Sequence, residues 1–263
     1  MRNAIASRTL LAGLIVLSTP LQAQTDYYNT DRGRPLRTED AYPVERRAFE
    51  IQAAPLRLER ASGGVYRWSV EPEIAYGILP RTQVELGVPF SVVDAAAGRQ
   101  AGAGGIHASV LHNLNVETSI PAFALSAAAL LPVGEFAPDD PYFSFRGIAT
   151  RTFTWARFHV NGEYTVGEET ADVSASELAR WSAGLAVDRT FPLRSLLLGA
   201  ELVVEQPIVE SEDQVVIAGA GFRYQLSPRW AMDAGAGKRM TGDDRSWYVT
   251  VGSAYAFGLP WRR

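Results

Sequence analysis

The sequence predicts an all-β protein that closes into an antiparallel transmembrane β-barrel of about 12 strands. Two observations carry this prediction. Segments of about ten residues with alternating apolar and polar side chains recur along most of the chain, and the connections between them alternate between short and long. Strands of this length can cross a bilayer when tilted, and only a closed sheet pairs all their backbone groups in hydrocarbon. The alternative is a soluble protein of two packed sheets, which would tolerate irregular loop lengths.

The alternation is clearest in residues 247–257, WYVTVGSAYAF. The odd positions carry mostly bulky side chains, from Trp247 to Phe257, and the even positions carry mostly small ones such as Gly252 and Ala254. This pattern indicates one face toward lipid and one toward a tight or wet interior. The same analysis predicts the full set of strands at residues 49–58, 65–78, 82–93, 105–113, 119–131, 143–155, 157–166, 178–188, 195–205, 214–226, 229–239 and 247–257.

The connections follow a regular order. Those after every second strand are short, at residues 79–81, 114–118, 156, 191–194 and 227–228. The others are longer and more polar, at residues 59–64, 94–104, 132–142, 167–177, 206–213 and 240–246. Short turns on one side and long loops on the other are typical of an outer-membrane barrel with periplasmic turns and extracellular loops. Aromatic residues near the strand ends, among them Trp68, Trp155 and Trp181, fit interfacial girdles.

The region before the barrel divides into two parts. Residues 1–23 have the pattern of a signal peptide, with Arg2 and Arg8, an apolar run at residues 10–17 and a small residue, Ala23, at the predicted cleavage site. Residues 24–47 are polar and show no period of 2 or 3.6. We expect an extended leader that either lies in the periplasm or folds back into the pore as a plug. The barrel then comprises residues 48–263.

Composition limits the remaining possibilities. Hydrophobic residues make up 47% and charged residues 21%, and the formal net charge is −4. These values argue against a disordered chain and against a nucleic-acid partner. The absence of cysteine excludes disulfides and thiolate metal sites. We expect no cofactor. The expected partners are outer-membrane lipid and lipopolysaccharide, the barrel-assembly machinery and a small-molecule solute.

Many charged side chains fall on the predicted inner face. Charged rings in a lumen tune the selectivity of a channel, so these residues are candidates for a selectivity lining. The competing interpretation is that they pair with one another and are simply solvated. The candidates are Arg67, Glu71, Glu73, Glu85, His107, His159, Glu163, Arg180, Asp188, Glu201, Arg223, Asp233 and Arg239.

His107 and Ser109 share one face of a strand, as the histidine and serine of some outer-membrane phospholipases do. Acyl transfer also needs a third group that orients the base, and Asn113 lies too far along the strand for this role. The pair also falls on the predicted inner face and not on the lipid face. His107, His112 and His159 lack the spacing of a metal site. We therefore expect no catalytic residues and no metal ligands.

Two stretches resemble a known family. Residues 34–50 read RPLRTEDAYPVERRAFE and residues 76–90 read YGILPRTQVELGVPF. Both are similar to the MetA-pathway of phenol degradation family of transporter-like outer-membrane barrels. The resemblance implies a channel whose gene accompanies pathways for aromatic or other hydrophobic compounds. Such barrels often end on an aromatic residue, but here six residues follow Phe257, so Phe257 and Trp261 both remain candidates for the assembly signal.

Three functional hypotheses follow. The first is a passive channel or transporter in the bacterial outer membrane for small, hydrophobic or aromatic solutes. The second is a structural or interaction barrel that conducts nothing. The third, which the sequence favours least, is an outer-membrane lipid hydrolase.

Overall fold

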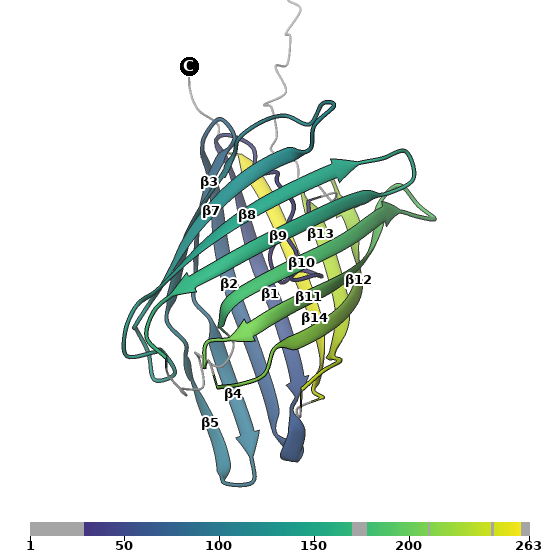
Figure 1. The fold of residues 1–263 in the computed structure, drawn as a ribbon. Helices are drawn as coiled ribbons and strands as arrows, with labels where there is room; N and C mark the ends of the chain where they lie inside the picture. The colour runs from purple at the N-terminus through teal and green to yellow at the C-terminus, as the bar shows by residue number, and fades with distance from the viewer. Residues whose placement is uncertain (1–28, 170–177, 210, 243–244, 259–263) are drawn as a thin grey trace, which may run out of the picture.

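The chain forms a closed antiparallel β-barrel, seen in a computed structural model that describes residues 29–169, 178–209, 211–242 and 245–258 (Figure 1). Each strand pairs with its neighbours along the sheet, and the first strand pairs with the last, so the sheet closes on itself. The predicted signal peptide lies outside the described residues. Within those residues, no helix has the length and apolar character needed to cross a membrane.

The named elements along the chain are all strands, except for one short 3₁₀ turn, Ser62–Gly64, between the first two strands. They are β1 Ala48–Arg60, β2 Tyr66–Leu79, β3 Thr82–Gly87, β4 Phe90–Ala95, β5 Gly98–Ala103, β6 Ile106–Asn113, β7 Ala122–Leu131, β8 Tyr142–Thr152, β9 Arg157–Val166, β10 Ala179–Thr190, β11 Leu196–Pro207, β12 Val215–Ser227, β13 Trp230–Arg239 and β14 Trp247–Gly258.

These strands make a barrel wall of 12 strand positions, as predicted. The short strands β3 and β4 share one position, and the short strands β5 and β6 share the next one. β3 and β4 both pair with β2, while β6 pairs with β3 and β5 pairs with β4. The predicted continuous strand at 82–93 is therefore wrong, because it is interrupted at Val88 and Pro89. Proline has no N–H to give to a ladder, which favours an interruption at this point.

The predicted loop at 94–104 is also wrong. It contains β5, which forms a hairpin with β4. This hairpin extends beyond the rest of the barrel at the end that carries the longer connections, the loop end; the opposite end, with the short connections, is the turn end (Figure 1). Two predicted strands are shorter than expected, since β7 begins at Ala122 and β8 ends at Thr152. The remaining boundaries differ from the prediction by a few residues.

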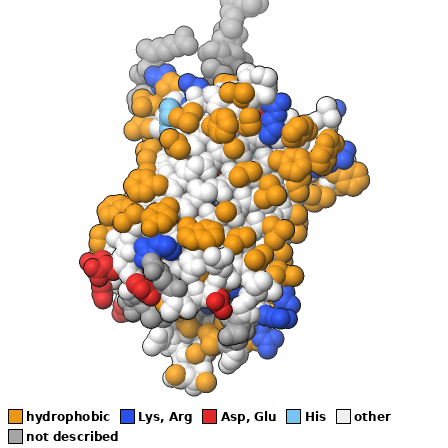
Figure 2. All heavy atoms as spheres, in the orientation of Figure 1, with side chains coloured by type: hydrophobic (Ala, Val, Ile, Leu, Met, Phe, Trp, Pro, Cys, Tyr) orange, Lys and Arg blue, Asp and Glu red, His pale blue; other side chains and the backbone are white. Residues whose placement is uncertain are grey.

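The outer surface is apolar around the barrel. On three adjacent strands, Val160, Leu185 and Leu202 stand opposite one another in the register and are 52%, 53% and 52% exposed. Hydrophobic side chains cover much of the wall in Figure 2, with acidic side chains gathered toward the loop end. An exposed apolar surface of this extent around a closed barrel requires lipid contact.

Aromatic side chains meet where the barrel closes. Phe49 on β1 stacks on Tyr76 and on Phe257, with ring centroids 4.4 Å and 5.4 Å apart. Tyr255 stacks on Phe257 in turn. Phe257 is thus part of the closing strand pair, whereas Trp261 lies outside the described residues.

We predict that Leu185→Arg impairs assembly of the barrel, while Ser182→Arg on the same strand does not. Arginine at the bilayer midplane on a lipid face costs about 2–4 kcal/mol, and a lumen position tolerates it. Ser182 lines the interior cavity described below. Heat-modifiable gel migration of the membrane fraction measures the folded share, and equal folding of both variants would contradict the lipid-facing assignment.

Candidate functional site

The interior of the barrel holds a folded segment, residues 29–47, which we call the inserted segment (Figure 1). It leaves the wall at the turn end, where Arg47 N–H donates to the Gly77 carbonyl at 2.7 Å. Its two arms are joined by the Asp40 N–H, which donates to the Thr30 carbonyl at 3.1 Å, and by the Asn29 side chain, which donates to the Tyr42 carbonyl. The segment is therefore a loop that enters the lumen and turns back.

Glu201 on β11 binds the backbone of the inserted segment. Its carboxylate accepts hydrogen bonds from the N–H groups of Arg37 and Thr38, each at 2.9 Å, and from the Thr38 hydroxyl at 2.8 Å. Next to it, Arg37 forms an ion pair with Glu205 at 2.7 Å. Hydrogen bonds to a charged acceptor are the stronger kind, so Glu201 is a principal anchor of the segment.

A second anchor lies on the neighbouring strands. The Asn161 side-chain amide on β9 accepts from the Glu39 N–H and donates to the Glu39 carbonyl, both at 2.8 Å. Arg146 on β8 pairs with the Glu39 carboxylate at 2.6 Å and also with Glu163. Glu163 in turn pairs with Arg32 at 3.0 Å. The wall thus satisfies both the backbone and the charge of the segment at this level.

The tip of the segment carries a buried network of charges. Arg34 is fully buried and pairs with Asp31, and it lies 3.6 Å from both Glu50 on β1 and Asp233 on β13. Arg223 on β12 pairs with Asp31 at 2.6 Å. Charges this deep are tolerated only when they are paired, so segment and wall depend on each other here.

Glycines in the wall make room for this tip. A Cβ atom at Gly221 would lie 2.6 Å from the Cβ of Pro35, and one at Gly235 would lie 2.7 Å from the Pro35 carbonyl oxygen. Real side-chain atoms do not approach so closely. The small residues on the inner faces of β12 and β13 therefore allow the backbone of the segment to lie against the wall.

Asp40 is buried within the segment. Its carboxylate accepts from the N–H groups of Thr30 and Tyr42, at 3.0 Å and 2.9 Å. Burial raises the pKa of Asp40 from 3.8 to about 7, against the opposing charge of Arg157, whose guanidinium lies 3.9 Å away. Arg157 and His159 on β9 both bind Asp188, and His159 also contacts Thr150, the acceptor for the Ala41 N–H.

The predicted lumen residues fall into three groups. Those against the inserted segment or directly behind its contacts are Glu163, Glu201, Arg223, Asp233, His159 and Asp188. A second group lies on β2, β3 and β6: Glu71, Glu73 and His107 face one another, and Glu85 accepts a hydrogen bond from the Ser109 hydroxyl at 2.9 Å. The third group lies toward the loop end, where Arg180 donates to the carbonyls of Thr165 and Gly167, and Arg67 and Arg239 lie near Glu59.

Several residues in these contacts were missed by the sequence analysis. Arg146, Asn161, Glu50 and Thr150 all contact the inserted segment or its charges. Their inward position follows from strand alternation, and Arg146 in particular is a charge in an otherwise apolar and small stretch. The partners themselves could not be predicted, because alternation gives the face of a side chain and not its neighbours.

Beyond the inserted segment, toward the loops, the lumen contains a cavity of about 260 Å³. Its charged part includes Arg32, Arg37, Glu71, Glu73, His107, Arg146 and Glu163, and its apolar part includes Leu130, Phe136, Tyr142, Leu178 and Val203. The lining therefore mixes charged with apolar and aromatic side chains, and the two kinds are neighbours, since His107 stands opposite Leu130 in the register.

Comparison with known proteins identifies the family. The family model described as "Putative MetA-pathway of phenol degradation" matches residues 110–257, more than half of the chain. The chain belongs to this family. The two stretches that carried the resemblance in the sequence precede the matched range. No curated protein matches the chain.

Solved structures agree on the fold. The COG4313 outer membrane channel from Pseudomonas putida F1 is 12% identical, with a TM-score of 0.58 over 87% of this chain and 100% of that one. The KdgM porin is 13% identical, with a TM-score of 0.51 over 78% and 98%. A NanC porin structure is 9% identical, with a TM-score of 0.53 over 79% and 98%. The chain thus shares the closed β-barrel fold of these outer-membrane channels and porins.

We predict that Glu201→Gln loosens the inserted segment. The native chain has no cysteine, so an Ala41→Cys reporter, buried in the docked segment, can be labelled with a maleimide when the segment leaves. Loss of charge-assisted hydrogen bonds costs about 1.5–3 kcal/mol, which raises the labelling rate about tenfold or more. Asp94→Asn, which removes an exposed ion pair with Arg99, serves as the control and should leave the rate unchanged. Equal rates in both variants would show that Glu201 is not an anchor.

We predict that the segment docks more tightly as the pH falls from about 8 to about 5. The pKa of Asp40 is about 7 when the segment is docked and returns toward 3.8 when the segment is released. At pH values between 3.8 and about 7, docking therefore takes up a proton. Burial also raises the pKa of Glu39, which acts in the same direction. Labelling of Ala41→Cys, normalised to the unfolded chain at each pH, should slow as the pH falls. Asp40→Asn should weaken this dependence; an unaltered dependence would exclude Asp40 as its source.

Proposed function

We propose that the protein is a passive channel for small solutes and that the inserted segment occludes it until displaced. The observation that carries this proposal is the cavity of about 260 Å³ inside the barrel, with the inserted segment lying between it and the turn end. Most contacts that hold the segment are polar, and the groups they join can be hydrated when they separate. Displacement would therefore open a lumen lined by charged side chains.

The lining of the cavity supports a solute with an apolar body and a polar substituent, such as a small aromatic acid or phenol. Leu130, Phe136 and Tyr142 offer apolar contact. Arg32 and Arg37 also line the cavity and can meet an anionic or hydroxyl group. The volume lies near the lower end of that of ligand pockets, which favours small solutes.

A lipid hydrolase is less well supported. The Ser109 hydroxyl donates to Glu85 at 2.9 Å, and the His107 Nδ1 atom faces Glu71 and Glu73. A serine nucleophile needs its histidine within hydrogen-bond reach. The two side chains have different partners, and their geometry therefore does not support a nucleophile and base pair.

We predict that Gly235→Val raises the single-channel conductance in planar bilayers. A Cβ at Gly235 would lie 2.7 Å from the Pro35 carbonyl oxygen but 3.3 Å from the nearest wall atom, the Ala220 carbonyl oxygen. The added side chain therefore displaces the tip of the inserted segment without altering any charge. Gly162→Val serves as the matched control, since a Cβ at Gly162 meets nothing within 4 Å, and its conductance should equal that of the wild type. Swelling of liposomes in small phenolic acids then measures solute passage.

The same experiment distinguishes the channel from a non-conducting barrel. If maleimide labelling of Ala41→Cys shows that the segment has left in Gly235→Val, and conductance and swelling remain absent, the channel proposal is wrong. The structural or interaction barrel would then be the better description.

A further inference from the structure

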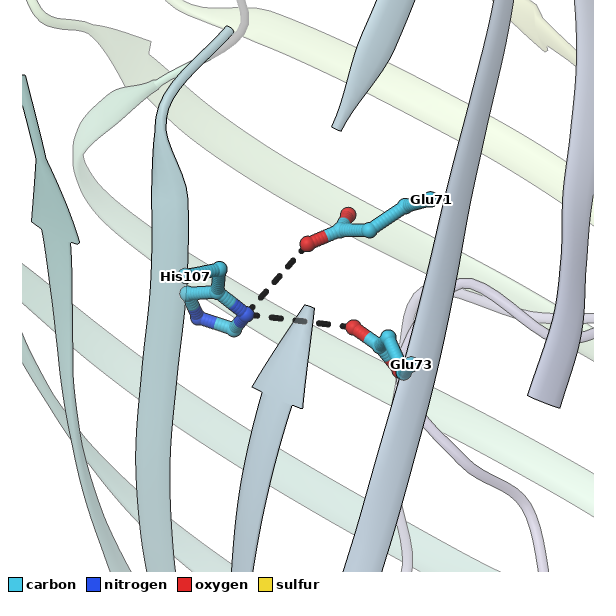
Figure 3. A group of neighbouring side chains, drawn as sticks. All are labelled: Glu71, Glu73 and His107. Carbon is cyan, nitrogen blue, oxygen red and sulfur yellow. Dashed lines mark ion pairs between the residues drawn. The ribbon is translucent and has the colours of Figure 1, made fainter. Parts of the chain in front are cut away.

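Glu71, Glu73 and His107 converge on one side of the cavity (Figure 3). The two glutamates lie two residues apart on β2 and point into the lumen, and the histidine reaches toward them from β6. The His107 Nδ1 atom is 3.3 Å from one Glu71 carboxylate oxygen and 3.8 Å from one Glu73 oxygen. One nitrogen and two carboxylate oxygens thus lie within 4.8 Å of one another.

Gly87 makes this approach possible. β3 lies between β2 and β6, and its last residue, Gly87, stands opposite both Glu73 and His107 in the register. A Cβ atom at Gly87 would lie 2.8 Å from the Glu73 Cγ and 3.3 Å from an oxygen of each glutamate. The missing side chain therefore leaves the space in which side chains from two non-adjacent strands meet.

The polar groups of this cluster are incompletely satisfied. Within the described residues, the His107 Nδ1 atom is buried and makes no hydrogen bond of ordinary geometry. In the same residues, the ion pairs of Glu71 and Glu73 are both with this one histidine. Two carboxylates facing a single imidazole leave an excess of negative charge, which a bound cation would neutralise.

We propose that Glu71, Glu73 and His107 form a binding site for a divalent first-row transition-metal ion of the Zn²⁺ class. Ligand atoms about 2.1 Å from a tetrahedral ion lie about 3.4 Å apart, so the observed separations need only a small movement of two flexible glutamate side chains. An imidazole ligand favours such ions over Ca²⁺ and Mg²⁺, which prefer oxygen.

The site has three protein ligands and opens into the cavity. The fourth position of the ion is thus available to water or to a solute in the lumen. A bound ion reverses the local charge beside Arg32, so occupancy would also shift the ion selectivity of the lumen. Metal binding itself does not depend on solute passage.

Titration calorimetry of the folded full-length protein with Zn²⁺ tests the proposal. We expect one site per chain, little or no response to Ca²⁺, and a loss of affinity of at least about tenfold in His107→Gln, because removal of a ligand costs no less than removal of its supporting contacts. His112→Gln is the matched control on the same strand. His112 is exposed and contacts the Thr82 hydroxyl at 2.8 Å, so this variant should bind as the wild type does.

Gly87→Ala provides a second variant that leaves all three ligands in place. Its side chain would occupy the space between the glutamates and should also weaken Zn²⁺ binding, while heat-modifiable migration verifies that the barrel has folded. If the wild type does not bind Zn²⁺, or if His107→Gln and Gly87→Ala both bind as the wild type does, the cluster is an ion pair of histidine with two carboxylates and the proposal is overturned.

Discussion

A strand that crosses hydrocarbon cannot leave its backbone N–H and C=O groups unpaired. In this protein the constraint is met by the pairing of β1 with β14, which turns a long antiparallel sheet into a closed wall. Because side chains alternate along each strand, closure sends one set outward to lipid and the other inward. The apolar row of Val160, Leu185 and Leu202 and the charged interior are therefore two results of one requirement.

The charged interior creates a second requirement, since buried charges need partners. Residues 29–47 supply many of them. Arg34 meets Asp233 and Glu50, Arg37 meets Glu205, and Glu39 meets Arg146. These pairs hold the segment firmly when it is docked. They are also hydrophilic, so water can replace each partner when the segment moves, which an apolar plug would not allow.

The interruption of the wall between β3 and β4 explains a second feature of the lumen. The regular ladder stops at Gly87, and the chain continues through Val88 and Pro89 before pairing resumes at Phe90. At this point the wall has a residue without a side chain, beside two glutamates and a histidine from the flanking strands. A local irregularity of the sheet thus provides the space for the proposed metal site.

The fold class and the 12 wall positions could be predicted from the sequence, because a period of two and alternating turn lengths are local properties of the chain. The same period predicts which candidate charges face inward. The sequence left open whether residues 24–47 lie in the periplasm or in the pore. It also gave no sign that His107 meets Glu71 and Glu73, which are more than thirty residues away. Contacts across the lumen place residues 29–47 inside the barrel, and strand register brings the histidine to the two glutamates. No spacing along the chain relates these side chains, so pattern alone could not predict their meeting.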